Sequence, residues 1–424
     1  MPKVTTHPSR WNALKMKLLI LFSVIGPGII AGTADNDAGG IAVYSVAGAS
    51  FGYKMLWLLI IVAIILGITQ EMGARLGLIT GKGLAALIRE NFTLKTTLFI
   101  VVITFVANWA NILAEYAAIS SIADMYGMPR YLAVPLAALL IWWIVYKGSF
   151  RIVQKVFLTS SLLFFSYVLA GFLSHPDWAE AGKSILVPSV PWDPNFLYIA
   201  VAVIGTTITA WGQFFVQSYF VDKGVASEHL KYARWDVIIG AFWTGFVAFF
   251  IVVATAGTLY VAGIQIQDAS QAAIALEPLA GTFAKHLFAW GLLNASLLGL
   301  AVIAMTSSYL VTEAFGWEGR VDLKKESPTF YRLFGFSVVS AALVILIPKL
   351  PLVTILVGSQ MLNTFVLPFL FFTILVLLNK GSLMGEHKNG WISNLISCIA
   401  VAFIVSMALA LVVLTLFHFG VSLT

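Results

Sequence analysis

Long apolar runs separated by short charged clusters dominate the chain from residue 18 to residue 417. A helix that crosses a bilayer needs about 20 apolar residues, and most of the runs approach or exceed that length. The pattern therefore predicts an all-α integral membrane protein with eleven spans. These are Leu18–Ala49, Met55–Leu76, Thr97–Ala123, Tyr131–Tyr146, Val156–Leu173, Phe196–Phe220, Val237–Val261, Leu287–Val311, Phe334–Ile347, Leu352–Leu378 and Trp391–Phe417. We expect the Pro-containing stretch Ser174–Asn195 to be an external loop.

The composition agrees with this class. Of the 424 residues, 60% are hydrophobic and 10% are charged, which excludes a water-soluble globular fold. Short loops leave no room for a sizeable extramembrane domain, so we expect residues 1–424 to form one transmembrane domain. Residues 1–17 are polar and lack the pattern of a cleavable signal, so the first span is expected to remain in the mature protein. The single cysteine, Cys398, excludes disulfide frameworks and cysteine-based metal sites.

Basic residues are distributed unevenly between the two sides of the expected spans. With loops assigned to alternate sides, twenty of the 25 Lys and Arg fall on one side and five on the other. Cytoplasmic loops carry such an excess. We therefore expect a cytoplasmic N-terminus, an external C-terminus and a location in the inner (plasma) membrane. The net charge of +6 then reflects topology and anionic lipid, and no nucleic-acid partner is expected.

Two apolar runs are interrupted at corresponding positions. The first span contains a GPG triplet at 26–28 and the segment GTADNDAGG at 32–40, which places Asp35 and Asp37 at bilayer depth. An intramembrane carboxylate costs at least about 2.5 kcal/mol on insertion scales, so it needs a partner or a cavity. The sixth span carries GTTITAWGQ at 205–213. Small-residue packing faces would explain the glycines but not the two aspartates.

Such a pair of interruptions, five spans apart, is typical of a transporter with inverted repeats and a midplane site between half-helices. We expect the repeats at about 18–173 and 196–378, with an extra helix at about 391–417. Carbonyl groups at the C-terminal ends of the first half-helices are unpaired and partly negative. The species bound beside Asp37 should therefore be a cation.

Polar residues also form stripes on two other spans. Asn108, Asn111 and Glu115 share one face of the third span. In the tenth span, Gln360, Asn363 and Thr364 form a second polar face. Each stripe could hold helices together through interhelical hydrogen bonds, or the two stripes could line an oxygen-rich cavity. The Glu115 carboxylate could attract cations or be a structural buried group.

The order and spacing of several short motifs resemble the NRAMP family of divalent-metal transporters over nearly the whole chain. The motifs are Gly26-Pro27-Gly28, Asp37-Ala38-Gly39-Gly40, Phe51-Gly52-Tyr53, Ala74-Arg75-Leu76-Gly77, Thr80-Gly81, Leu113-Ala114-Glu115, Ser359-Gln360 and Leu367-Pro368-Phe369. The resemblance implies a LeuT-like fold, with two inverted five-helix repeats, broken helices 1 and 6, and here an eleventh helix. It also implies a metal site between the first and sixth helices.

The chain departs from this family pattern at positions that would select the metal. After Asp37, Ala38 and Gly40 stand where the family's DPGN tetrapeptide has Pro and Asn. The methionine of the family's sixth-helix MPH motif is replaced by Thr209 or Ala210, depending on the end from which the motif is aligned. The family's two sixth-helix histidines have no counterpart, because the six histidines of this chain lie in loops or near span ends.

These departures favour a hard cation. A thioether favours softer transition ions, whereas carboxylate, carbonyl and water suit Mg²⁺ or Ca²⁺. Small residues at positions 38, 40 and 210 predict a wide, wet pocket, and Mg²⁺ usually keeps several of its waters. The pattern looks like the NRAMP-related magnesium transporter branch. We expect Mg²⁺ as the cargo, Mn²⁺ as a second candidate, and no cofactor.

The positions that match the motifs of the NRAMP family indicate the candidate site residues. Asp37 is the expected anchor, directly or through water, and the carbonyl groups of Ala34 and Thr207 are candidate ligands. Gln213 and Gln360 are candidates for holding outer-sphere waters, and the polar groups at 35 and 36 are inferred from position alone. The full set is Ala34, Asp35, Asn36, Asp37, Gly40, Thr207, Thr209, Ala210, Gln213 and Gln360, with Asn111 and Glu115 as secondary polar groups.

The free energy supplied by the membrane potential indicates whether import of a divalent cation needs a second, coupled ion. A divalent cation that moves down an inside-negative potential releases about 4.6 kcal/mol per 100 mV, twice the single-charge value. This corresponds to about three decades of concentration ratio. We therefore expect uncoupled import by alternating access, and no enzymatic activity.

Two other transport functions stay open at this stage. A proton-coupled Mn²⁺/Fe²⁺ symporter of the NRAMP type would be favoured by transport of Cd²⁺, which demands soft ligation. A sodium-coupled amino-acid symporter on the same scaffold is less favoured, because an anionic substrate prefers half-helix N-termini free of aspartate. An intramembrane hydrolase is not expected, because Asp35 and Asp37 share one segment and the spans contain no HExxH motif.

Overall fold

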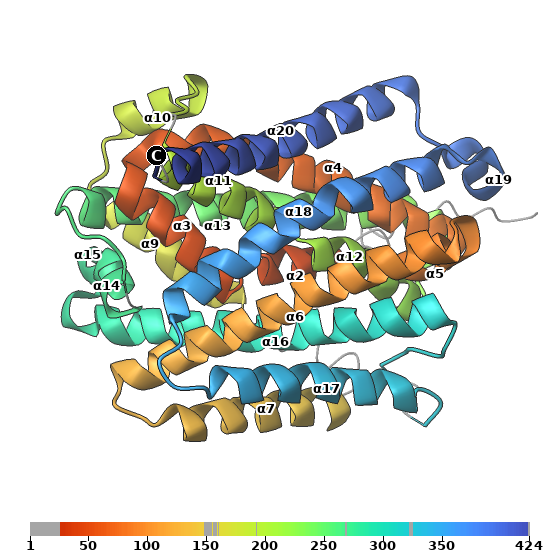
Figure 1. The fold of residues 1–424 in the computed structure, drawn as a ribbon, viewed down its shortest axis with the longest axis horizontal. Coiled ribbons are helices and arrows are strands. Elements are labelled where there is room, and N and C mark those ends of the chain that lie inside the picture. The colour runs from red at the N-terminus through yellow and green to blue at the C-terminus, as the bar shows by residue number, and fades with distance from the viewer. Residues whose placement is uncertain are drawn as a thin grey trace, which may run out of the picture.

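The computed structural model describes residues 26–147, 155, 159, 161–191, 193–267, 269–321 and 325–422. Within these ranges the fold is entirely helical, and the long helices run roughly side by side (Figure 1). The helices are α2 (Pro27–Ala34), α3 (Ala38–Phe51), α4 (Leu56–Thr80), α5 (Leu84–Asn91), α6 (Leu94–Met125), α7 (Arg130–Lys147), α9 (Phe165–Leu173), α10 (Trp178–Leu186), α11 (Pro194–Thr207), α12 (Ala210–Asp222), α13 (Leu230–Thr255), α14 (Ala269–Ala273), α15 (Glu277–Ala280), α16 (Ala284–Phe315), α17 (Pro328–Ile345), α18 (Leu352–Asn379), α19 (Gly381–Met384) and α20 (Trp391–Ser422).

The expected spans correspond to these helices. Nine helical segments in the described ranges are long and apolar enough to cross a membrane, and one of them is the 43-residue run of α3 and α4 together. The fifth expected span is represented by the shorter apolar helix Leu162–Leu173. Residues 18–25 of the first expected span, and residues 156–158 and 160 of the fifth, lie outside the described residues. The stretch expected as a plain external loop differs, because it contains α10, which Asp177 caps by accepting from two backbone N–H groups.

The loops gather at the two ends of the bundle as the alternation of spans requires. At one end Arg75 donates to the His387 carbonyl group at 2.8 Å, and Lys380 donates to Asn91 at 2.6 Å. At the other end the Tyr53 hydroxyl accepts from the Asp177 N–H at 3.2 Å. In Figure 1, α5 and α19 lie at the first end, whereas α10, α14 and α15 lie at the second. Among the described residues, Lys and Arg are more numerous at the first end, where Arg75, Arg89 and Lys380 lie.

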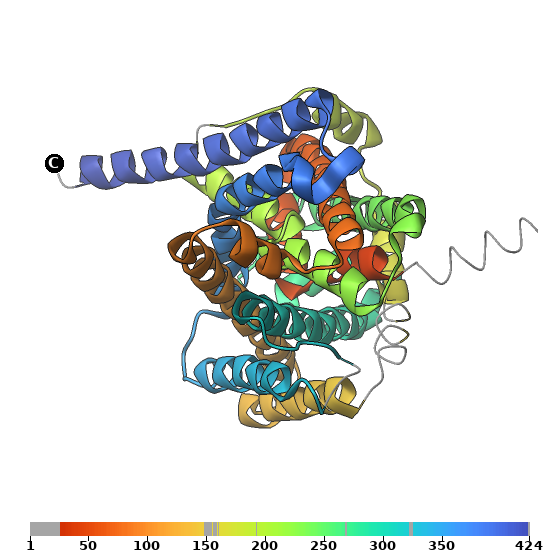
Figure 2. The ribbon, with the colours of Figure 1, turned by 90° about the vertical axis from the view of Figure 1, so that its right-hand side faces the viewer.

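The two broken segments form the centre of the bundle. Every residue from Ile199 to Phe220 is buried, and so is almost all of α2. The surrounding helices shield this centre: α13 packs on α2, α3 and α4, while α16 and α18 pack on α6 from the other side. By contrast, α20 lies on the outside against α4, α11 and α18. Figure 2 shows its C-terminal part projecting from the side of the bundle.

Candidate metal site

The first helix break lies between α2 and α3. Asp35 and Asn36 form a turn after α2, and Asp37 is the N-cap of α3. Its Oδ1 accepts a hydrogen bond from the Gly40 N–H at 2.6 Å, which satisfies a backbone donor that the helix leaves unpaired. Its Oδ2 is buried and has no hydrogen-bond partner in the described part of the chain. Asp37 is therefore fixed through Oδ1, and its Oδ2 is a candidate ligand atom.

Close backbone packing on α13 fixes the position of α2. A Cβ at Gly32 would lie 2.3 Å from the Gly240 carbonyl oxygen, so only glycine allows the two helices to approach this closely. The Thr244 hydroxyl donates to the Gly32 carbonyl group at 2.7 Å. The position of the first break is thus set by α13, the seventh expected span.

A buried carboxylate on α13, Asp236, caps the N-terminus of α2. It accepts hydrogen bonds from the backbone N–H groups of Gly26, Gly28 and Ile29 at 3.1, 2.7 and 3.4 Å. Negative charge at a helix N-terminus is favourable because the N–H groups there carry partial positive charge. An aspartate directly before an apolar run is visible in the sequence, but its capping role is not, because its partners lie about two hundred residues away.

We expect Asp236→Ala to destabilise the protein by about 2–3 kcal/mol, because it removes charge-assisted hydrogen bonds from buried donors. Thermal unfolding in detergent, followed by fluorescence-detected size exclusion, would measure the loss. The matched control is Asp124→Ala, since Asp124 is an exposed partner of Arg130 at 3.7 Å and such pairs contribute about 0–1 kcal/mol. Equal losses from the two variants would contradict a specific role of Asp236.

The second break lies between α11 and α12. Ile208 follows the last residue of α11, and Thr209 is the N-cap of α12, where its hydroxyl accepts from the Gly212 N–H at 3.0 Å. The Thr207 hydroxyl is committed to the Val203 carbonyl group at 2.7 Å. Thr207 is the last residue of α11, so its carbonyl group has no partner within that helix.

Asp35 joins the two breaks. Its Oδ1 accepts from the Thr209 hydroxyl at 3.0 Å, and its Oδ2 accepts from the Gln70 side-chain amide at 3.2 Å. All three side chains are fully buried. Gln70 was not among the residues expected at the site, although an amide side chain within the apolar run of the second span is visible in the sequence. Asp35 is therefore a link between α2, α4 and α12 as well as a candidate ligand.

Oxygen atoms from both breaks converge beside Gly40. A Cβ at this position would lie 3.0 Å from the Asp35 carbonyl oxygen, 3.1 Å from the Thr206 hydroxyl and 3.3 Å from Asp37 Oδ1. The Thr206 hydroxyl is buried and unpartnered among the described residues. Our sequence-based set contained the neighbouring Thr207 but not Thr206, because the helix phase at the break cannot be read from the sequence.

The polar stripes of α6 and α18 meet next to the first break. Asn111 donates to Asn363 Oδ1 at 3.0 Å, and Asn363 donates to Gln360 Oε1 at 3.1 Å. The side-chain amide nitrogen of Gln360 lies 1.9 Å from where a Cβ of Gly39 would be. The stripes thus both connect the helices and reach the break, and Asn111 reaches it only through Asn363 and Gln360.

Glu115 is a further buried carboxylate next to the first break. Its Oε2 accepts weakly from the Ala38 N–H at 3.4 Å, and its side chain lies within reach of Asp37. On its other side it packs against Gly299 of α16, where an added Cβ would lie 2.6 Å from Oε1. Glu115 therefore lies beside Asp37 and contacts the backbone of the segment that carries it.

Several buried polar atoms around the breaks have no partner in the described part of the chain. They are Asn36 Oδ1, Asp37 Oδ2, Glu115 Oε1, Thr206 Oγ1, Gln213 Oε1 and Nε2, and Gln360 Nε2. Each such atom costs about 1–3 kcal/mol if it stays unpaired, so the cluster is suited to bind an ion or water. The candidate side chains are fully buried, which means that the structure is closed around them.

Ala34 is the last residue of α2 and Ala210 is the first residue of α12, so both lie at the two helix breaks.

The donor set is rich in oxygen. Within the described ranges, no three His, Cys, Asp or Glu side chains gather as a metal cage. The groups that converge here are carboxylates, amides, hydroxyls and helix-terminal carbonyls, which suit a cation that is held in part through water.

The helices and the two breaks define a multi-pass membrane transporter with a LeuT-like fold, whose solved neighbours include a crystal structure of the Eremococcus coleocola manganese transporter. That likeness has a TM-score of 0.74 at 19% identity and covers 96% of this chain and 88% of that one. The chain belongs to the Nramp family, because the model described as "Natural resistance-associated macrophage protein-like" matches residues 28–414.

Curated relatives agree with this assignment. The chain is 28% identical over 411 residues to the divalent metal cation transporter MntH of Klebsiella pneumoniae subsp. pneumoniae, covering 93% of this chain and 94% of that protein. It is 26% identical over 406 residues to MntH of Yersinia pestis, covering 94% and 96%. The expected class, a divalent-metal transporter of the membrane, is thereby confirmed, whereas the choice of metal is a separate question.

Proposed function

We propose that this protein imports Mg²⁺ by alternating access, driven by the membrane potential and without proton coupling, as a member of the magnesium-transporting branch of its family. The observation that carries the proposal is the group of buried oxygens at the two breaks. Asp37 Oδ2 and Thr206 Oγ1 have no partner among the described residues, and the three heavy atoms nearest to a Cβ at Gly40 are all oxygens. No thioether stands at position 209 or 210, and the small side chain of Ala210 leaves room for water.

The cation is bound in this proposal by Asp37 as the anchor. The carbonyl groups of Ala34 and Thr207 complete an inner set, and Gln213 and Gln360 hold waters of the hydration shell. Both polar atoms of the Gln213 side chain and the amide nitrogen of Gln360 are without partners among the described residues, which supports this role. Mg²⁺ dehydrates reluctantly, so a site that leaves most of its waters in place has a smaller barrier to overcome.

Three further expectations belong to the proposal. The inverted repeats extend over about 18–173 and 196–378, with α20 as the additional helix. The end of the bundle that holds α5 and α19 is cytoplasmic, because it carries the excess of Lys and Arg. The C-terminus is then external.

The experiment is transport into proteoliposomes with a metal-sensitive dye and a pH dye in the lumen. With an inside-negative potassium diffusion potential we expect Mg²⁺ entry and an unchanged lumenal pH. A pH gradient without a membrane potential should not drive accumulation, because the divalent charge alone supplies about 4.6 kcal/mol per 100 mV. Acidification of the lumen in proportion to metal entry would overturn uncoupled import.

The second candidate is a proton-coupled Mn²⁺/Fe²⁺ symporter of the Nramp type, and Mn²⁺ as the cargo is favoured by the likeness to a manganese transporter. Cd²⁺ distinguishes the two candidates, because it is transported well only where a soft ligand binds it. Robust Cd²⁺ entry together with lumenal acidification would select this second function.

A further inference from the structure

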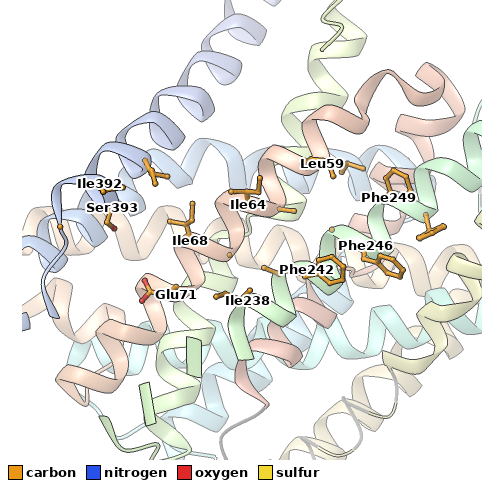
Figure 3. Close-up of a pocket in the computed structure, with 18 residues that line it drawn as sticks. Leu59, Ile64, Ile68, Glu71, Ile238, Phe242, Phe246, Phe249, Ile392 and Ser393 are labelled. Carbon is orange, nitrogen blue, oxygen red and sulfur yellow. The ribbon is translucent and has the colours of Figure 1, made fainter. Parts of the chain in front are cut away.

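A deep apolar groove lies on the outer surface of the bundle, away from the metal site. Its volume is about 1130 Å³, and it is lined by residues of α4, α13 and the start of α20 (Figure 3). Small residues of α4 and α13, among them Gly67 and Gly245, stand where the two helices meet. The exposed side chains of Ile64 and Phe242, at 59% and 68%, contribute to its walls.

The groove has the length of one lipid leaflet. It extends along α4 from Leu59 to Glu71 and along α13 from Ile238 to Phe250. Twelve residues of a helix rise about 18 Å, and half of the hydrocarbon core of a bilayer is about 15 Å thick. An acyl chain that enters at the Glu71 end would therefore reach slightly beyond the middle of the membrane.

One end of the groove is lined by the carboxylate of Glu71, to which two arginines bond. Glu71 accepts from Arg234 Nε at 2.8 Å and from Arg75 at 3.2 Å, so two guanidinium groups surround one carboxylate. Arg75 is nearly buried and also bonds to Asn389 and to the His387 carbonyl group, whereas the side chain of Arg234 stays 45% exposed. The surplus positive charge thus lies at the mouth, on the side with the excess of Lys and Arg.

We propose that this groove binds a phospholipid with an anionic headgroup, its acyl chains lying between α13 and α20 and its phosphate beside Arg234. The apolar interior matches acyl chains, the length matches one leaflet, and the cationic mouth matches the phosphate and its anionic headgroup. Gln70, which donates to Asp35, directly precedes Glu71 on α4. The lipid would therefore contact the helices that hold the first break in place, α4 and α13.

The test uses the full-length, delipidated protein in detergent and native mass spectrometry. Three ligands are titrated: phosphatidylglycerol, phosphatidylcholine with the same acyl chains, and glycerol phosphate without chains. We expect phosphatidylglycerol to bind at least about fivefold more tightly than phosphatidylcholine, the factor that corresponds to about 1 kcal/mol for one basic side chain at an anionic headgroup. Glycerol phosphate should not bind, because it cannot fill the groove.

Two variants separate the mouth from the groove. Arg234→Gln should remove the preference for phosphatidylglycerol but keep binding of both lipids. Gly67→Leu should weaken both lipids, because its Cβ has ordinary space 3.6 Å from Ala241 and the rest of the side chain would occupy the groove. The controls are Arg332→Gln, an exposed arginine at the same end, and Val339→Phe on the outer face of α17, and both should behave as the parent.

Equal binding of the two lipids by the parent, or an unchanged preference in Arg234→Gln, would overturn the proposal. The same spectra report the oligomeric state. A dimer that dissociates in Gly67→Leu would assign the groove to a second copy of the chain and would equally overturn a lipid site.

Discussion

Asp37→Asn is expected to reduce Mg²⁺ uptake by at least about a hundredfold, because one unit of charge near a bound ion is worth about 4 kcal/mol at 4 Å and an effective dielectric constant of 20. The asparagine keeps an oxygen for the Gly40 N–H that Asp37 now caps at 2.6 Å. The fold should therefore survive while the charge is lost. Initial rates of Mg²⁺ entry into proteoliposomes, normalised to reconstituted protein, measure the effect.

Asp177→Asn is the matched control for this change. Asp177 is also the N-cap of a helix, α10, and accepts backbone hydrogen bonds at 3.0 and 2.9 Å, but it lies at an exposed end of the bundle. Mg²⁺ uptake by Asp177→Asn should therefore equal uptake by the parent protein. Asp37→Ala extends the series: it should also lose transport and should cost about 1 kcal/mol of stability through the lost cap. Parental Mg²⁺ rates in Asp37→Asn would rule out Asp37 as the anchor.

Ala210→Met should change the selectivity of transport from hard to soft cations. A thioether at the start of α12 would offer a soft ligand to ions that pass the break, and it would displace water that Mg²⁺ keeps. We expect the ratio of Cd²⁺ to Mg²⁺ uptake to rise by about tenfold or more, the direction that ligand softness dictates. Parallel uptake series with Mg²⁺, Mn²⁺, Ca²⁺ and Cd²⁺ provide the measurement.

The control for this prediction separates ligation from overpacking. Ala210 is fully buried, and so is Ala200 on α11. Methionine at either position adds the same volume to a packed core, which lowers the free energy of unfolding by about 1–3 kcal/mol. Ala200→Met should thus lower stability without admitting Cd²⁺. If both variants shift selectivity equally, or neither does, position 210 is not the one that faces the ion.

The structure shows which of the two positions, 209 or 210, can accept a methionine without losing hydrogen bonds. Thr209 is occupied as the N-cap of α12 and as the donor to Asp35 at 3.0 Å. A methionine there would remove both hydrogen bonds, whereas Ala210 makes no side-chain hydrogen bond that would be lost. Position 210 is therefore the cleaner place to introduce a thioether.

Much of the candidate site could be proposed from the sequence because its signals are local. Asp35 and Asp37 are conspicuous in an apolar run, and the glycines around them indicate a broken helix. Residues that act through distant partners escaped detection. Asp236 caps a helix that begins about two hundred residues earlier in the chain, and Thr206 became part of the site only through the close approach of Gly40.

The sequence by itself determined the spans, their alternation and the two interruptions, because crossing a bilayer demands about 20 apolar residues whose backbone groups are satisfied within each helix. Only the tertiary structure decided which polar groups meet. Thr209 and Asp35 are 174 residues apart, and Asn111 and Asn363 are 252 apart. Hydropathy is a property of each segment alone. The partner of a buried polar group depends on how helices from distant segments pack, and this packing can depend on one glycine that lacks a Cβ.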